Sequence, residues 1–411
     1  MRVTTAFNRM LNLPGASVTD VGFGPSGVVV AVRLRRRRRV CAVCGSVEGL
    51  EVHEHRVKRW RHLDLGACRC TIECELRRLR CRTCGVHLEP VPWARPVAGY
   101  TRDFEDVVAW LAQQMAKTPI ARLLHVAWDS VGKIVERVVA DELDEDRLAG
   151  LVMIGCDEIS YRRGQRYLTT VADHRTGRVV WCSPGRNAQT LQDFFDVLGE
   201  RKSSIRAVSI DMNGGYEKAI RAAVPHAEVC FDPFHVVALA GRAVDDVRRA
   251  EWNTHAKSTT PTGKWLKGVR WALRKAPENL TDRQQLALAE VQRTNKRLYR
   301  AYLLKEQLRA LYHLPDRAAA PEHLKAWLAW ASRSQLKPFV RLARTLKARR
   351  DGILAAIRLG LTNSRLEGLH SKVRLLSHRS FGFHSPDPLI ALIYLCASGI
   401  EITLPTFTPN P

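Results

Sequence analysis

The spacing of hydrophobic positions changes several times along the chain. From residue 98 to 146, apolar residues recur at helical spacing and predict helices over 104–115, 119–125 and 130–139. The short break before the last of these helices is typical of a helix-turn-helix, whose third helix would offer Lys133 and Arg137 to DNA. A plain three-helix spacer is the alternative interpretation. We expect the acidic tract at 141–146 to act as a linker.

After residue 150 the pattern becomes one of short apolar runs separated by turn residues, which is typical of strands. Three strands, then helix, strand, helix and strand, is the order of a ribonuclease H-like fold. The predicted elements are strands at 151–156, 167–172 and 178–182, a helix at 191–201, a strand at 206–210, a helix at 216–223 and a strand at 227–231.

A long helical stretch follows, from residue 235 to about 360, with five tryptophans that we expect to lie in the core. It separates two parts of the predicted core and is interpreted as an insertion. The fold class is therefore multidomain α+β and α/β. The expected domains are a zinc-ribbon-like finger at 1–97, a helix-turn-helix with its linker at 98–146, the first part of the RNase H-like core at 147–240, a helical insertion at 241–355 and the rest of the core at 356–411.

The net charge of the chain indicates which class of molecule it binds. The chain has 65 Lys and Arg against 41 Asp and Glu, a net charge of +24, which favours a polyanion such as double-stranded DNA. The run Arg35, Arg36, Arg37, Arg38 and Arg39 would sit well against phosphates, although such a run is also typical of a solvated surface. The apolar run at 388–400 is shorter than the roughly 20 residues of a membrane-spanning helix. We expect a cytoplasmic protein that associates with the nucleoid.

Four cysteines form two C-x-x-C pairs, which predict a structural zinc site. Gly45 and Gly85 follow the two pairs and would allow a tight turn, and the 36 residues between the pairs should hold a hairpin. The predicted ligands are Cys41, Cys44, Cys81 and Cys84.

Other thiols and imidazoles in this region are interpreted differently. Cys68, Cys70 and Cys74 share one parity of a strand-like stretch, so we expect them to be core residues. The nearby histidines, His53, His55 and His62, are expected on the surface and are not assigned to the metal.

Acidic residues at three places could form a catalytic metal site. Asp157 and Asp211 follow predicted strands, and the carboxyl ends of adjacent strands lie at one edge of an open sheet. Glu367 begins a predicted helix among many cations. Ser364 and Glu367 also match a capping box, so helix capping is the alternative role for Glu367. Three carboxylates suit Mg²⁺ or Mn²⁺, which together with phosphate oxygens would support phosphodiester cleavage.

The sequence resembles the DDE-type transposases of bacterial insertion sequences, and among them the ISL3 family. The resemblance covers nearly the whole chain and includes WRHLDLGACRCTIEC, PVPWAR, GCDEISYRRGQRYLTTVAD, SIDMNGGY, FDPFHVV and NSRLEGLHSKVRLLSHRSFGF. It implies recognition of terminal inverted repeats, strand cleavage at the element ends and attack of the 3′-hydroxyl on target DNA, with Asp157, Asp211 and Glu367 as the catalytic triad.

The same resemblance implies an auxiliary role for Asp232 and His235, which match the Asp-x-x-His of related transposases. Lys372 and Arg374 would hold DNA phosphates. We expect a homo-oligomer on DNA. Two other functions stay open: a DNA-binding regulator with a vestigial catalytic core, and a nuclease without strand transfer.

Overall fold

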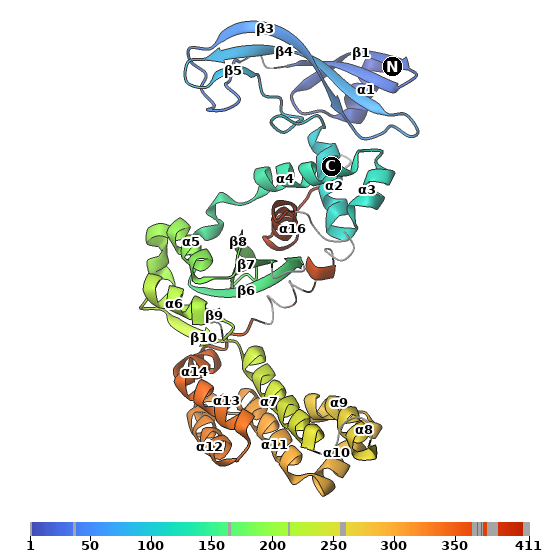
Figure 1. The fold of residues 1–411 in the computed structure, drawn as a ribbon. Helices are drawn as coiled ribbons and strands as arrows, with labels where there is room; N and C mark the ends of the chain where they lie inside the picture. The colour runs from blue at the N-terminus through green and yellow to red at the C-terminus, as the bar shows by residue number, and fades with distance from the viewer. Residues whose placement is uncertain are drawn as a thin grey trace. The chain divides into compact units, whose positions relative to one another are not determined.

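The computed structural model describes residues 2–35, 38–162, 166–212, 214–254, 260–363, 368, 371, 373–375 and 385–405. Contacts within the chain define two compact units (Figure 1). One is Met1–Asp144 with Val373–Pro411, and the other is Glu145–Lys372.

A five-stranded sheet opens the first unit, in the order β1-β2-β4-β3 with β5 also pairing with β4. Strand β4 alternates between the two faces of the sheet, and Cys70, Ile72, Cys74 and Leu76 are buried on one of them. The antiparallel pairing of β3 with β4 confirms the hairpin predicted between the two cysteine pairs. The elements are α1 (Val3–Leu11), β1 (Ala16–Gly24), β2 (Gly27–Leu34), β3 (Glu51–Arg61), β4 (Cys70–Cys81) and β5 (Gly85–Leu88).

Three helices follow in this unit, α2 (Arg102–Gln114), α3 (Lys117–Leu123) and α4 (Trp128–Glu142), close to the predicted bounds. The late helix α16 (Asp387–Ala397) packs against α4 and α2. Most residues of α16 are buried, which explains the apolar run near the C-terminus. Residues 356–411 were predicted to complete the catalytic core, but α16 belongs to the unit that contains the helix-turn-helix.

A buried arginine ties these helices together. Arg95 is only 3% exposed, and its guanidinium lies 2.8 Å from Asp106, 2.9 Å from Asp141 and 2.9 Å from Glu142. Asp141 and Glu142 are the last two residues of α4. The acidic tract predicted as a linker therefore begins inside a helix, where it neutralises a buried cation.

The second unit contains the predicted central sheet, in the order β10-β9-β6-β7-β8. Strands β7 and β8 are antiparallel to their neighbours, whereas β6, β9 and β10 run parallel to one another. This is the ribonuclease H-like order expected from the sequence. The elements are β6 (Met153–Arg162), β7 (Arg166–Asp173), β8 (Val179–Pro184), α5 (Ala188–Leu198), β9 (Ala207–Ile210), α6 (Gly214–Ala223) and β10 (Glu228–Phe231).

A helical block continues the second unit without a break in its hydrophobic core. Helix α14 lies directly against β10: a Cβ atom at Gly352 would come within 2.6 Å of the Val229 carbonyl oxygen, so only glycine allows this approach. The helices are α7 (Pro233–Thr254), α8 (Pro261–Gly268), α9 (Arg270–Arg274), α10 (Asp282–Thr294), α11 (Lys296–Ala310), α12 (Ala320–Arg333), α13 (Lys337–Ala348) and α14 (Arg350–Leu359).

The tryptophans of this block only partly match the expectation that they are core residues. Trp327 is buried, while Trp252, Trp265 and Trp330 are half-buried against the core. Trp271 is 58% exposed, and the Arg270 and Arg274 guanidinium carbons lie 5.3 and 5.9 Å from its ring centroid, so its assignment to the core was wrong.

Candidate functional site

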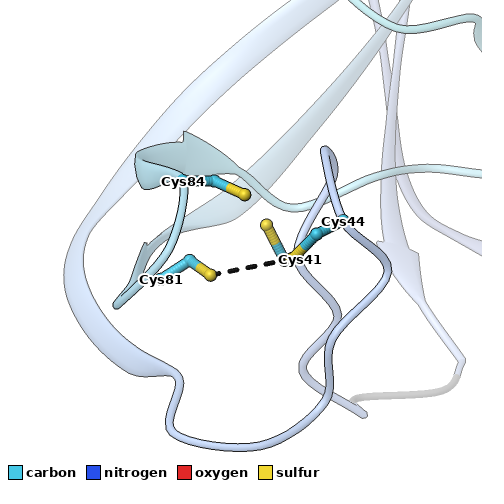
Figure 2. A group of neighbouring side chains, drawn as sticks. All are labelled: Cys41, Cys44, Cys81 and Cys84. Carbon is cyan, nitrogen blue, oxygen red and sulfur yellow. Dashed lines mark hydrogen bonds between the residues drawn. The ribbon is translucent and has the colours of Figure 1, made fainter.

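The two cysteine pairs come together in the first unit (Figure 2). The sulfur atoms of Cys41, Cys44, Cys81 and Cys84 all lie within 4.8 Å of one another, and the Cys44 and Cys81 sulfurs are 3.8 Å apart. A tetrahedral zinc ion with bonds of about 2.3 Å requires sulfur–sulfur separations of about 3.8 Å. Among the residues that the structure describes, no other group of at least three such side chains converges in this way.

The backbone favours a thiolate at the first cysteine of each pair, whereas the hydrogen bond with the Cys44 thiol raises the pKa of Cys84 to about 12. The amides of Cys44 and Val43 hydrogen-bond to Cys41 and lower its pKa to about 7, and the amides of Cys84 and Thr83 lower the pKa of Cys81. Gly45 and Gly85 have φ of +70° and +83°, which confirms the tight turns expected after the pairs. The cluster is therefore shaped for a metal that prefers thiolate ligands.

The remaining thiols and histidines of the sheet differ in part from expectation. Cys70 and Cys74 are buried core residues as predicted, but Cys68 is exposed, because it lies in a turn ahead of β4. His62 was expected on the surface, yet it is 5% exposed and its Nδ1 lies 2.9 Å from Thr101 Oγ1. Burial lowers the pKa of His62 to about 4, so the neutral ring is part of the folded structure.

The basic residues predicted to contact DNA have different surroundings. Lys133 is exposed on α4, whereas Arg137 donates to the buried carboxylate of Glu105, with 2.9 Å between Arg137 Nε and Glu105 Oε1. Within the arginine run, Arg35 Nε donates to Ser17 Oγ, Arg39 Nη1 donates to the Leu50 carbonyl, and Arg38 is exposed. Arg36 and Arg37 lie outside the described residues.

The parallel strands of the second unit bring acidic residues to one level of the sheet. Gly155 on β6 is the register partner of Ser209 on β9, so Asp157 and Asp211 are each two residues further along adjacent strands. Phe231 on β10 pairs with Ile210, so Asp232 and Asp211 directly follow paired residues. Because β6 runs on to Arg162, Asp157 lies within the strand and not at its end as predicted. The register itself assembles this carboxylate group.

Asp232 and His235 form a pair at the start of α7. His235 Nδ1 lies 3.2 Å from Asp232 Oδ2, and Asp232 is only 2% exposed. The hydrogen bond to Asp232 raises the pKa of His235, and the charges of Asp232, Asp211 and Asp157 raise it further. His235 is therefore favoured in its protonated form by the carboxylates on this side of the sheet.

A buried asparagine connects the strands of this carboxylate group, and sequence reasoning missed it. Asn363 is 1% exposed: its Nδ2 donates to the Cys156 carbonyl at 3.3 Å, its backbone amide donates to Asp232 Oδ1 at 2.9 Å, and its Oδ1 accepts from Ser209 Oγ. His174 Nε2 also lies 2.6 Å from that serine oxygen. The only sign of this role in the sequence is that a polar residue stands immediately before a row of apolar residues at helical spacing.

The other predicted residues of this site are not all described. Glu367 and Lys372 lie outside the described residues, whereas Arg374 is exposed. In the sequence, Asn363 is the last described residue before Glu367.

Together, the ribonuclease H-like sheet with its carboxylates and the helix-turn-helix define a DNA-binding enzyme of the RNase H-like class. Residues 89–139 match the family profile described as the helix-turn-helix domain of transposase family ISL3, and residues 154–393 match the ISL3 profile described as transposase. The chain belongs to the ISL3 family of DDE-type insertion-sequence transposases.

Relatives support the same assignment over almost the full length. The chain is 40% identical over 435 aligned residues to the transposase for insertion sequence element IS1557 of Mycobacterium tuberculosis, with 98% of each protein covered. It is 29% identical to the transposase for insertion sequence element IS1001 of Bordetella parapertussis, with 88% of this chain and 90% of the relative covered. The protein is thus a transposase that mediates DNA transposition.

A solved structure, the Drosophila P element transposase strand transfer complex, is a more distant neighbour. It shares 10% sequence identity and has a TM-score of 0.39, over 72% of this chain and 92% of that chain. No helix in the part of the chain that the structure describes is long and apolar enough to cross a bilayer.

Proposed function

We propose that Asp157, Asp211 and Glu367 hold the catalytic Mg²⁺ or Mn²⁺ with which this transposase cleaves strands at the ends of its element and joins 3′-hydroxyls to target DNA. The observation that carries the proposal is the register of β6 and β9: Asp157, within β6, and Asp211, directly after β9, each come two residues after the paired Gly155 and Ser209. Both side chains are half-buried. Carboxylate oxygens at this exposure are suited to hard divalent cations that keep part of their shell for water and phosphate.

The bound metal would activate the attacking oxygen and stabilise charge on the leaving oxygen. The side chains of the protein would position the carboxylates and provide the cations that face DNA. Asn363 connects the middle of β6, at Cys156, and Ser209 of β9 to Asp232. Asp157 Oδ1 accepts from the Glu158 amide at 2.7 Å, which restrains that carboxylate. Lys372 and Arg374 are the cations expected to hold DNA phosphates.

Asp232 and His235 would act as an auxiliary pair. Protonated His235 donates from Nδ1 to Asp232, and its Nε2–H is then a second donor suited to a phosphate oxygen. Because the neighbouring carboxylates raise the pKa of His235, the protonated form is favoured beside an anionic DNA strand.

In the first unit, Cys41, Cys44, Cys81 and Cys84 would bind one structural zinc ion, and the sheet and helices that it supports would recognise the terminal inverted repeats. Lys133 is the residue of α4 best placed to reach DNA, since Arg137 is already paired with Glu105. The arginines at 35–39 would contact phosphates without reading sequence. We further propose that the protein assembles as a homo-oligomer on DNA in the bacterial cytoplasm, at the nucleoid.

The test is a reaction of the purified full-length protein with Mg²⁺ and duplexes that carry the flanks of the encoding element, followed by denaturing electrophoresis. We expect a nick at the element end and, with target plasmid, joined products. Binding without a nick would favour the regulator, and nicks without joined products would favour the nuclease. Asp211→Asn is the matched control, because it removes one charge and keeps the side chain's size.

A further inference from the structure

A cavity of about 520 Å³ lies beside the Asp232–His235 pair in the second unit. Its walls come from the start of α7, from the turn after α11 and from the end of α14, all within the same unit. Pro233 and Phe234, which line it, stand in the sequence between Asp232 and His235. A cavity of this volume falls in the range that encloses a small molecule or a nucleotide.

The lining combines an aromatic face with cations. Phe234 is 58% exposed, and its ring centroid lies 5.6 Å from that of His235. Arg317 is exposed at the rim, where a Cβ atom at Gly360 would lie 3.1 Å from Arg317 Nη1. No acidic partner of Arg317 occurs among the described residues. An exposed aromatic ring and an unpaired guanidinium in the same cavity suit a base with its phosphate.

One buried donor in this cavity is unsatisfied. Tyr312 lines the cavity, and its Oη is buried without a hydrogen-bond partner among the described residues. Burial raises the pKa of Tyr312, and the Asp232 charge raises it further, so the hydroxyl stays protonated and can donate. An unpaired buried hydroxyl is costly, and a base edge carries acceptors that would satisfy it.

We propose that this cavity receives one nucleotide of the DNA strand beside the scissile phosphate, with its base turned out of the duplex and stacked on Phe234. Tyr312 Oη would donate to the base, and Arg317 would face its phosphate. Enzymes that act on DNA extrude a nucleotide into such pockets, where aromatic stacking and a few hydrogen bonds offset the lost base stacking. The inference rests on the proposed function, because it requires the strand to reach the carboxylate group.

The experiment pairs a protein change with a DNA change, using the full-length protein. Phe234→Ala is combined with a set of end duplexes, each lacking one base near the cleavage site, and both cleavage in Mg²⁺ and binding in Ca²⁺ are measured. On intact DNA, Phe234→Ala should reduce cleavage by about tenfold or more. On one abasic duplex, and only one, parent and variant should differ by less than about twofold, since the stacking partner is already gone.

Two further variants keep the result interpretable. Tyr312→Phe preserves ring volume and should lower cleavage of intact DNA while leaving the unfolding midpoint unchanged. Leu286→Ala changes a residue that is 73% exposed on α10 and should behave like the parent. Equal loss for Phe234→Ala on every duplex, or no loss on intact DNA, would overturn the proposal. Competition by a free deoxynucleoside monophosphate as strong as that by DNA would overturn the assignment to a strand.

Failure of the proposed function is recognised separately. If the parent protein does not nick end duplexes in Mg²⁺, the transposase mechanism proposed above is wrong. The binding measurements in Ca²⁺ still report whether Phe234 and one particular base interact.

Discussion

The thiol group of the first unit and the carboxylate group of the second are assembled in contrasting ways. Four cysteines from two local turns bring their sulfurs within 4.8 Å, and backbone amides already favour thiolates there. The carboxylates come from separate strands, and buried polar residues such as Asn363 and Ser209 hold those strands together. A structural ion needs a closed ligand set, whereas a catalytic ion needs open positions that substrate completes. The two groups differ as the two proposed roles would require.

The first test of this contrast is a variant that lacks one of the four sulfur atoms. We expect Cys81→Ser to abolish zinc binding and to unfold the surrounding turns, because structural zinc contributes roughly 10–16 kcal/mol in small domains. Metal content by mass spectrometry and the circular dichroism spectrum measure the effect. Cys70→Ser, at a buried thiol outside the cluster, should keep one zinc ion per chain; loss of zinc there but not from Cys81→Ser would show that the ligand set is wrong.

The corresponding change in the carboxylate group should leave the fold intact. Asp157→Asn and Asp211→Asn should each lower strand cleavage by at least about 10³-fold, with little change in unfolding midpoint or end binding. The double variant should be little worse than either single variant, because residues that act as one unit are not additive. If the losses of cleavage in the two single variants instead multiply in the double variant, the two aspartates do not act as one site.

A third prediction concerns pH and the first unit. The pKa of His62 falls from about 6.5 when unfolded to about 4 when folded, so the unfolded chain binds more protons between these values. Stability should therefore be complete above pH 6.5 and decline as pH falls towards 4, by roughly 3 kcal/mol. Urea unfolding at several pH values should show a shallower decline for His62→Gln. The exposed His55→Gln should retain the slope of the parent; equal slopes for all three proteins would exclude His62 as the source.

The smallest expected effect on stability tests the connection within the carboxylate group. Asn363→Ala leaves the Cys156 carbonyl and Ser209 without their buried partner, which should cost about 1–3 kcal/mol. Cleavage should fall further than this loss of folded protein explains, because β6 and β9 lose their connection to Asp232. Asn253→Ala, at an exposed position on α7, is the control. A stable Asn363→Ala protein with full cleavage would contradict the role given to this residue.

Local pattern was sufficient to predict the three helices at 102–142, the strand order of the second unit and the four-cysteine cluster, because periodicity and C-x-x-C spacing depend on neighbours in sequence. Local pattern failed at positions whose burial depends on tertiary contacts. Parity placed Cys68 in the core, but the strand begins only at Cys70. Arg95, His62 and Asn363 look like surface residues in sequence, and they are buried because partners 39 or more positions away satisfy them. Trp271 is large and apolar, yet it is 58% exposed, with two guanidinium groups near its ring.

The same reasoning applies to the C-terminal segment. The front end was expected to be complete by residue 146, but α16 supplies buried side chains to α2 and α4, and Gln113 Nε2 donates to the Leu395 carbonyl at 2.9 Å. No short-range pattern connects positions so far apart in the chain. End binding is therefore best measured on the full chain.

The most direct measurement of the central claim is cleavage of end-containing DNA by Glu367→Gln. Glutamine keeps the length and one acceptor of glutamate, and it also serves in a capping box, so a residue that only caps its helix should tolerate the change at a cost of about 1 kcal/mol or less. If Glu367 completes the carboxylate group, cleavage in Mg²⁺ should fall by orders of magnitude while folding and end binding persist. Cleavage within about tenfold of the parent would contradict the assignment of the three carboxylates to one catalytic metal site.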